Sequence, residues 1–386
     1  MIYLDNGATS YPKPPEVIEA VTEVMSDYCA NPGRAGHFMA ARTAQEIYRS
    51  RLFLARLFNT GSPGRIVFTG SCTESLNLAL KGLLNPGDHV VTTSMEHNSV
   101  MRPLHSLEKK GVEVSIVRGD RQGRISPVAI RQAIRPDTKL IVVTAASNVT
   151  GTKAPLEEIG RIALRNGIIF MVDAAQGAGH MQIDAKAQHI DILAAPGHKG
   201  LLGPQGTGLL YIREGLKLRP FKEGGTGTRS KELDQPSDMP EGFEAGTLNS
   251  PGIIALGAAA RVITRIGIDV IEEHERRLCE KLERGLRNID GVTLYGPEDT
   301  REKTAVTALN IDGLDCEDAA EILSSRYGIA VRAGFHCSGT AHETIGTADR
   351  GCVRITPGIY TSEKEITETV AAIGEIAKQA QQMRHS

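Results

Sequence analysis

The chain has 386 residues, of which 40% are hydrophobic, 23% are charged and 4% are aromatic, and its net charge is −2 at pH 7. This balance excludes a disordered chain, and it supplies no basic field for nucleic acid or an anionic membrane. The length predicts a large domain and a smaller one. The chain has neither a signal-peptide pattern nor an apolar run of the roughly 20 residues that span a bilayer, so we expect a cytoplasmic protein.

Short apolar, β-branched segments alternate with helical patterns through the first part of the chain. Many are apolar on both faces, as strands of a covered parallel sheet are, and this predicts an α/β domain around a mostly parallel seven-stranded sheet. The predicted strands are 66–69, 89–93, 112–117, 140–145, 168–173, 192–195 and 208–212, with helices that include 40–58 and 156–165.

The pattern changes after Pro251. Long helices are predicted at about 253–266 and 268–288, and strands and a last helix after Ser362 follow, which indicates a smaller α+β unit. Segment 223–250 is rich in Gly, Pro, Ser and Thr and is predicted to be a loop. The predicted division is a large domain of residues 15–252 and a small domain of residues 1–14 and 253–386.

Two polar residues stand at the ends of neighbouring predicted strands. Lys199 lies in a glycine-dense loop after strand 192–195, where ligands bind in parallel sheets, although a surface lysine would look the same. Asp173 ends the apolar strand 168–173. A carboxylate there can pair with the protonated pyridine nitrogen of a cofactor, and this protonation makes the cofactor ring an electron sink. The structural alternative is that Asp173 is the N-cap of a helix.

Two further segments follow predicted strands. Cys72 and Thr73 begin a helix after strand 66–69, where backbone N–H groups and a hydroxyl can hold a phosphate. The Gly-Lys-Ser/Thr of a Walker motif is missing, and an ordinary capped helix would show the same residues. His97 follows strand 89–93 and can stack on a planar ring, although a lone histidine is more often structural.

Together, these segments resemble the class V aminotransferase group of fold-type I enzymes that use pyridoxal 5′-phosphate (PLP), and within it the cysteine desulfurases. The resemblance runs from Leu4-Asp5-Asn6-Gly7-Ala8-Thr9 to Arg354. It implies that PLP forms a Schiff base with Lys199. The other residues that it implies at the cofactor are Asp173 at the pyridine nitrogen, Gln176 at the ring oxygen, His97 stacked on the ring, Asn148 beside substrate and ring, and Cys72, Thr73 and His198 at the phosphate.

The resemblance also bears on the quaternary structure and on the phosphate contacts. Segment 243–247, which ends at Thr247, resembles the loop by which a partner subunit reaches the phosphate, and this implies a homodimer. Pro196 stands where the family often has a serine, which implies that one side-chain contact to the phosphate is missing.

Cys337 is the feature that selects the reaction. Arg332 and then Cys337, after Gly-x-His, resemble the active-cysteine segment of the desulfurases. A thiolate is the nucleophile that removes sulfur from a bound cysteine. Arg354 resembles the residue that grips the substrate carboxylate, for which the guanidinium fork is suited, with a surface salt bridge as the alternative. The implied reaction converts L-cysteine to L-alanine and leaves a persulfide on Cys337, which a thiol or an acceptor protein then takes.

The same residues leave other functions open. A selenocysteine or cysteine-sulfinate lyase uses the same scaffold, whereas Cys337 argues against an epimerase. Lys199 and Asp173 argue against a non-catalytic sulfur-trafficking scaffold. A zinc site of His336, Cys337, His342 and Cys352 has poor spacing for a structural finger, so we expect no metal. All six cysteines are expected to be thiols, and Cys29, Cys279, Cys316 and Cys352 are interpreted as packing residues.

Overall fold

The computed structural model describes residues 1–32 and 36–385. Its large sheet consists of β2 (Ile66–Thr69), β3 (His89–Thr93), β4 (Glu113–Val117), β5 (Thr138–Thr144), β6 (Ile169–Asp173), β7 (Ile192–Pro196) and β8 (Gly208–Ile212). The strand order is β2-β8-β7-β6-β5-β3-β4. The strands from β7 to β4 are parallel, and β8 is antiparallel to both of its neighbours. The predicted mostly parallel, seven-stranded α/β fold is therefore confirmed.

Each face of this sheet packs against its own layer of helices. On β5, Leu140 and Val142 join one core and Ile141 and Val143 join the other, and none of the four is more than 1% exposed. This alternation explains why the strand is apolar at every position. The first core includes α3 (Cys72–Leu83) and α4 (Asn98–Glu108), and the second includes α2 (Phe38–Leu57), α6 (Leu156–Arg165) and α7 (Ser250–Ile266).

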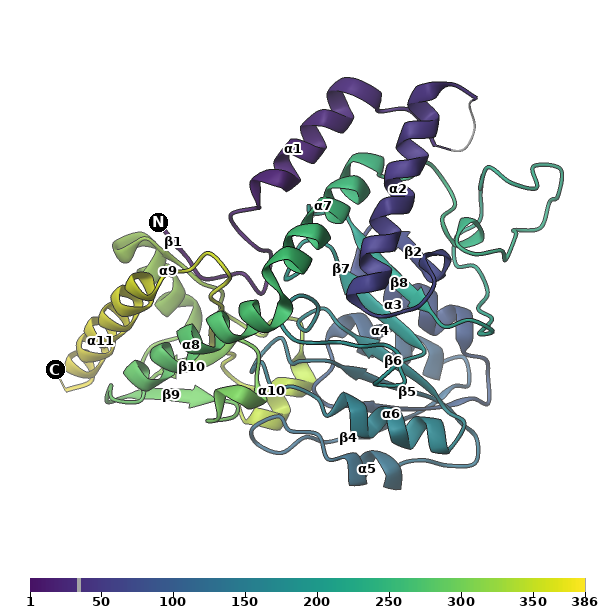
Figure 1. Cartoon of the computed structure of the whole chain (residues 1–386). Coiled ribbons are helices and arrows are strands. Elements are labelled where there is room, and N and C mark those ends of the chain that lie inside the picture. Colours follow the sequence, from purple (N-terminus) through teal and green to yellow (C-terminus); the bar gives the residue numbers. More distant parts are fainter. Residues whose placement is uncertain (33–35, 386) are drawn as a thin grey trace.

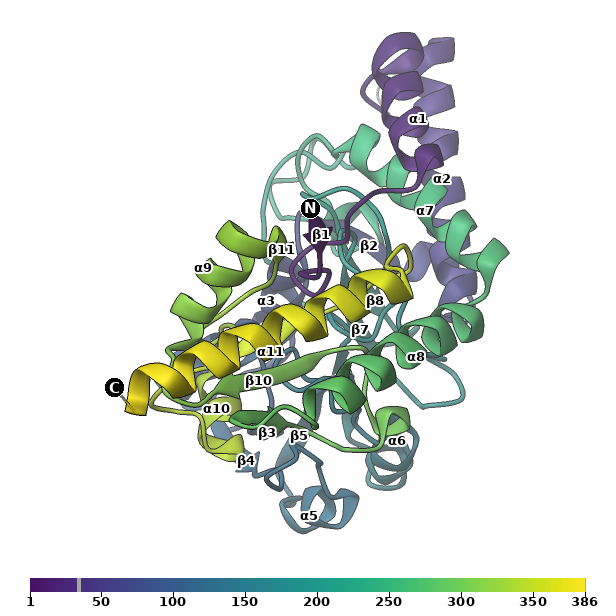
Figure 2. The ribbon, with the colours of Figure 1, turned by 90° about the vertical axis from the view of Figure 1, so that its left-hand side faces the viewer.

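A smaller unit lies beside the large sheet (Figure 1). Its antiparallel sheet has the order β12 (Val353–Ile355), β10 (Thr307–Ile311), β9 (Val292–Tyr295), and β1 (Ile2–Tyr3) pairs in parallel with β11 (Ile329–Ala330). Figure 2 shows α11 (Glu363–His385) crossing in front of β10, with α8 (Ile268–Leu286) and α9 (Cys316–Tyr327) on either side. The remaining helices are α1 (Pro15–Glu23), a π-helical turn Val24–Tyr28, α5 (Pro127–Gln132), α10 (Gly339–Ile345) and 3₁₀ turns at Pro63–Arg65, Glu241–Phe243 and Thr300–Glu302.

The smaller unit has a separate hydrophobic core, to which Leu4 contributes together with residues of α8, α9, β10, β12 and α11. The first strand therefore packs with the C-terminal part of the chain. Helix α7, which the sequence assigned to the small domain, instead packs on α1 and α2 and joins a core of the large sheet. The domain boundaries themselves stay a prediction.

The sheet topology brings the polar segments to one edge. Because β8 is antiparallel to β2 and to β7, β2 runs in the same direction as the parallel strands. Strands β2, β3, β5, β6 and β7 therefore all end at the same edge. The residues that follow these ends are Cys72, His97, Asn148, Asp173 at the end of β6, and Lys199. The carboxyl edge of a parallel sheet is where α/β proteins bind ligands.

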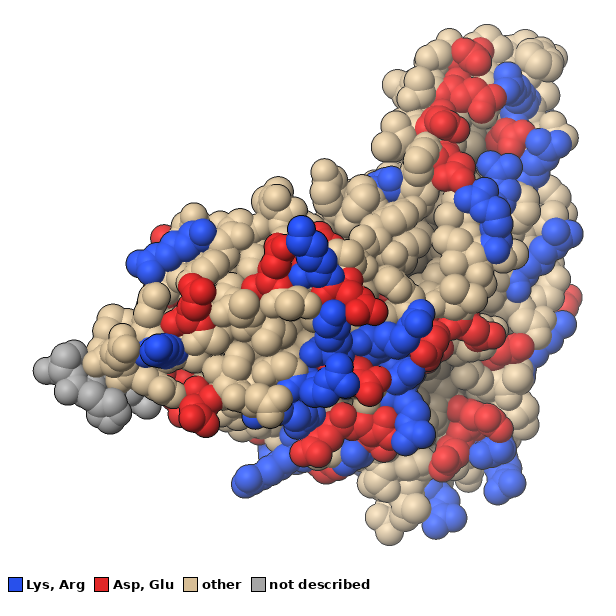
Figure 3. Space-filling view, turned by 60° about the vertical axis from the view of Figure 1, so that its left-hand side comes forward, with Lys and Arg blue, Asp and Glu red and all other residues tan. Residues whose placement is uncertain are grey.

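The surface mixes charges of both signs. Figure 3 shows lysine and arginine beside aspartate and glutamate on the face in view. Ion pairs on the protein surface include Arg124–Glu302 at 2.6 Å and Arg276–Glu273 at 2.8 Å. None of the helices in residues 1–32 and 36–385 is long and apolar enough to cross a membrane.

Candidate active site

Lys199 lies in a turn that the N-terminal segment holds in place. The carbonyl oxygen of His198 accepts hydrogen bonds from Ser10 N at 3.0 Å, Thr9 Oγ1 at 3.1 Å and Lys13 Nζ at 2.9 Å. These three donors fix the backbone next to Lys199. Burial of the Lys199 amine, with Arg354 nearby, lowers its pKa from the ordinary value. A larger fraction of this amine is therefore neutral at pH 7 than in an exposed lysine, and the neutral amine is the form that acts as base and nucleophile.

Asp173 is 1% exposed at the end of β6. Its Oδ1 accepts from Ala175 N at 2.9 Å and from the thiol of Cys72 at 3.5 Å. Burial and this carboxylate raise the pKa of Cys72, so Cys72 remains a neutral donor. Among the described residues, no cation lies within ion-pair distance of Asp173, which leaves the carboxylate available to a cationic group that enters the crevice.

His97 caps helix α4 and is held in one orientation. Its Nδ1 accepts from the backbone N–H of Ser99 at 3.0 Å, so the neutral ring carries its proton on Nε2. Burial is the main reason that the pKa of His97 is lowered, and Asp173 and Lys199 are close enough to act on it. A neutral ring beside these two residues is suited to stacking on a planar cofactor.

The other residues predicted at the cofactor have mixed surroundings. Gln176 is buried and donates from Nε2 to Gly7 O at 2.9 Å. Thr73 is exposed, and its hydroxyl shares a hydrogen bond of 2.8 Å with Ser99. His198 has a buried Nδ1 without a partner, and burial lowers the pKa of this ring to about 4. A buried ring nitrogen without a partner is a candidate contact for a ligand.

Cys337 is an exposed residue of a loop that is bonded to the large domain on both sides of the cysteine. Asn98 N donates to Cys337 O at 2.8 Å, directly beside His97. Asn148 Nδ2 donates to His336 O at 2.6 Å, and Asn148 Oδ1 accepts from Ser338 Oγ at 2.7 Å. His336 and Cys337 have φ values of +48° and +59°, which are uncommon for residues with a side chain. These bonds fix the backbone of the loop that carries the exposed thiol beside Asn98 and Asn148.

Arg354 is 3% exposed on β12 and lies beside the same crevice. Its Nη1 donates to Asn148 O at 3.0 Å, its Nη2 pairs with Asp5 Oδ1 at 3.0 Å, and its Nε is buried without a partner. A Cβ on Gly7 would lie 3.2 Å from the guanidinium carbon, so only glycine leaves this group uncrowded. Arg332 is exposed and pairs with Arg354 through the backbone, at 2.7 Å and 3.2 Å.

Thr247 is exposed and lies in a different place. It lines a cavity of about 640 Å³ with Tyr48, Arg51 and Thr226, and no crevice residue described above lines this cavity. Glu244 anchors the Thr247 loop, because it is buried, pairs with Arg51 and accepts from Phe68 N at 2.6 Å. The structure therefore brings the other predicted residues together around Lys199 but places Thr247 on an outer surface.

The crevice fits PLP on two observations. The Lys199 amine has a lowered pKa, and the buried Asp173 carboxylate near it has no cationic partner among the described residues. Sequence reasoning missed Asp5, Ser338 and Glu96. Glu96 is fully buried beneath the site, and burial raises its pKa to about 8. Its position directly before His97 was the signal that could have identified it.

Comparisons with known proteins agree with this geometry. Residues 2–368 match the family model described as Aminotransferase class-V. The chain is 38% identical to a probable cysteine desulfurase of Methanothermobacter thermautotrophicus, over 97% of this chain and 94% of the relative. The apo structure of a cysteine desulfurase from Thermococcus onnurineus NA1 has a TM-score of 0.93 and 37% identity, over 98% and 95% of the two chains. The Escherichia coli cysteine desulfurase CsdA has a TM-score of 0.88 and 28% identity, over 99% and 94%.

Proposed function

The chain belongs to the class V aminotransferase family, and on that premise we propose that it is a PLP-dependent cysteine desulfurase that converts L-cysteine to L-alanine. One observation carries the proposal: the exposed thiol of Cys337 lies on a loop bonded to Asn98 and Asn148, at the crevice that contains Lys199 and Asp173. A nucleophile held at a fixed position gains much of its rate from that placement.

The residues around Lys199 would bind the cofactor and move protons. Lys199 would hold PLP, Asp173 would pair with its ring nitrogen, and His97 would stack on the ring. PLP supplies an electron sink for the carbon that loses a proton. Lys199 Nζ, whose pKa is lowered by burial, is the base that takes the Cα proton of the substrate. Arg354 binds the substrate carboxylate with its remaining N–H donors.

Cys337 carries out the sulfur transfer. Its thiolate attacks the substrate sulfur, an S–S bond forms, and the Cβ–S bond breaks. The electron pair of the broken bond stays with the carbon skeleton, which takes up a proton at Cβ and leaves as alanine. The exposure of Cys337 allows the persulfide sulfur to pass to an external thiol or to an acceptor protein. A cytoplasmic location remains a prediction.

The homodimer is part of the proposal and rests on the outer surface around Thr247. Tyr48, which lines the same cavity, is 56% exposed, and two further large apolar side chains are exposed on α1 and α2: Ile18 at 60% and Phe38 at 76%. An exposed apolar surface beside a cavity is typical of a subunit interface. Thr247 of one subunit would then reach the phosphate of the other. Tyr48→Glu should convert a dimer to a monomer in light scattering, and a monomeric wild-type chain would contradict this part.

Cys337→Ser tests the reaction, with Cys29→Ser as the matched control because Cys29 is also an exposed thiol. The Cys337→Ser protein should keep the absorbance of bound PLP but lose persulfide formation and nearly all alanine release from L-cysteine. Cys29→Ser should retain both. Alanine release at the wild-type rate from Cys337→Ser would refute the desulfurase assignment.

A further inference from the structure

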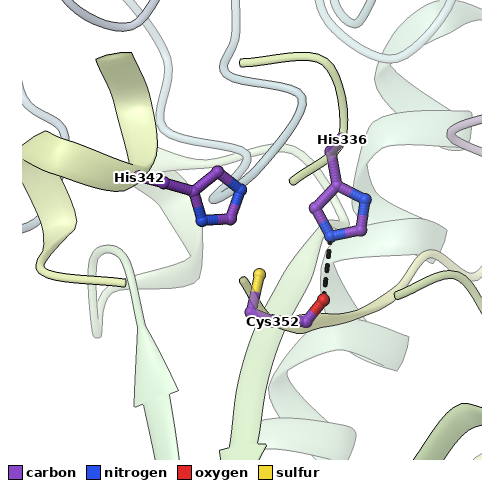
Figure 4. Close-up of side chains that lie close together, drawn as sticks. All are labelled: His336, His342 and Cys352. Carbon is purple, nitrogen blue, oxygen red and sulfur yellow. Dashed lines mark hydrogen bonds between the residues drawn. The ribbon is translucent and has the colours of Figure 1, made fainter. Parts of the chain in front are cut away.

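Three side chains that the proposed reaction does not use meet behind the Cys337 loop. They are His336, which precedes Cys337, His342 on α10, and Cys352, which precedes β12. One ligand atom of each, a ring nitrogen or the thiol sulfur, lies within 4.8 Å of those of the other two. Figure 4 shows the two rings facing each other with the thiol of Cys352 between and below them.

These three side chains are buried, and not all of their polar atoms have a hydrogen-bond partner. His342 and Cys352 are 0% exposed and His336 is 5% exposed. His342 Nδ1 bonds to Thr347 Oγ1 at 2.7 Å, which leaves Nε2 buried without a partner. Cys352 carries a free thiol. A buried polar atom without a hydrogen-bond partner is unfavourable and rare, so this ring nitrogen is a candidate contact for a ligand.

We propose that His336, His342 and Cys352 form a binding site for Zn²⁺. Two imidazoles and one thiolate are ligands that zinc prefers, and three protein ligands leave a fourth position for water. The sequence spacing argued against a zinc finger that also used Cys337. The structure indicates a different, three-residue site: it brings His336, His342 and Cys352 together and leaves Cys337 exposed. The proposal does not depend on the reaction proposed above.

The three ligand atoms must move closer together to bind zinc. With Zn–N bonds of about 2.0–2.1 Å and a Zn–S bond of about 2.3 Å, tetrahedral ligand atoms lie about 3.3–3.8 Å apart, so the cluster must contract by about 1 Å. His336 Nε2 now bonds to Cys352 O at 3.0 Å, and coordination by this atom exchanges that bond for one to the metal. The Thr347 hydroxyl at His342 Nδ1 is the kind of outer partner that orients a zinc-bound histidine.

Zinc binding would displace the proton of the Cys352 thiol, because the thiolate is the form that ligates a metal. The Cys352 thiolate offsets one charge of the metal. Zinc would join the Cys337 loop, helix α10 and the start of β12, and so fix the backbone on the N-terminal side of the nucleophile.

Equilibrium dialysis of the reduced, PLP-loaded protein against Zn²⁺, with zinc measured by elemental analysis, tests the site. We expect one zinc per chain. Loss of an outer partner alone weakens zinc binding about 10–100-fold, so His342→Gln and Cys352→Ser should each weaken it by at least about 100-fold. Cys279→Ser is the matched control, since Cys279 is another buried free thiol, and it should bind zinc as the wild type does.

Cobalt substitution keeps the test valid if a ligand variant fails to fold. Co²⁺ bound to the Cys337→Ala protein should give a sulfur-to-cobalt charge-transfer band in the difference spectrum, because Cys352 supplies the thiolate. Zinc should also raise the Tm of the wild type and of Cys279→Ser with increasing concentration. Loss of the cobalt band in Cys337→Ala would overturn the proposal. The proposal would also be overturned if the His342→Gln and Cys352→Ser variants each bound zinc as tightly as the wild type.

Discussion

Replacement of Arg354 by lysine should separate substrate binding from cofactor binding. Arg354 uses Nη1 for Asn148 O and Nη2 for Asp5 Oδ1, and a guanidinium has five N–H donors. Donors therefore remain for a carboxylate, among them the buried Nε. Lysine keeps the charge but loses the planar fork, so at least one hydrogen bond to the substrate carboxylate is lost.

A hydrogen bond to a charged group contributes about 1.5–3 kcal/mol. At about 1.4 kcal/mol per factor of ten, Arg354→Lys should raise the KM for L-cysteine about 10- to 150-fold. PLP absorbance should stay unchanged, because the proposed role of Arg354 is to bind the substrate and not the cofactor. The assay is alanine release against cysteine concentration, with Arg350→Lys as the control for an exposed arginine of the same segment. An unchanged KM in Arg354→Lys would refute the assignment.

Three further substitutions test the residues beneath the cofactor. Lys199→Ala should abolish turnover and leave no borohydride-reducible link between PLP and the chain; a reducible adduct in this variant would contradict its role. Asp173→Asn should keep bound PLP but lower alanine release at least about 100-fold, because a neutral amide does not hold a proton on the ring nitrogen, and a near-wild-type rate would show that Asp173 only caps the turn to Ala175. Glu96 has its pKa raised to about 8, so from about pH 4.5 to 8 the folded chain holds a proton that the unfolded chain has lost, and stability falls by up to about 1.4 kcal/mol per pH unit. Glu96→Gln should remove this fall, and denaturant unfolding at pH 5 and pH 8 that shows the same pH dependence in both proteins would contradict the assignment.

The strands could be predicted because burial on two faces leaves a pattern in the sequence itself. The start of helix α7 differs from the prediction. We predicted its start at about residue 253, beyond Pro251, but it begins at Ser250 with Asn249 as its N-cap. Proline is favoured in the first turn of a helix, where its missing N–H has no partner to lose, so Pro251 lies inside the helix and not before it.

The candidate site could be predicted only where polar residues follow strands. Lys199, Asp173 and His97 were found in this way, and a common strand direction brings them together. The bond between Asp5 and Arg354 joins residues at opposite ends of the chain, and the bond between Ser338 and Asn148 crosses between the two units. No periodicity in the sequence records such pairings, because they depend on how the smaller unit packs against the edge of the large sheet.

Asn148 links the two tasks that desulfuration requires. Its side chain bonds to His336 O and to Ser338 Oγ, on both sides of Cys337, and its backbone oxygen accepts from Arg354. The left-handed backbone at His336 and Cys337 is costly for residues with a Cβ, by about 1–2 kcal/mol each, so the loop depends on these bonds for its shape. Asn148 therefore contacts both Arg354, which would bind the substrate carboxylate, and the loop that carries the Cys337 thiol. In the proposed site, the segment after β5 would therefore help to position both the substrate carboxylate and the Cys337 loop.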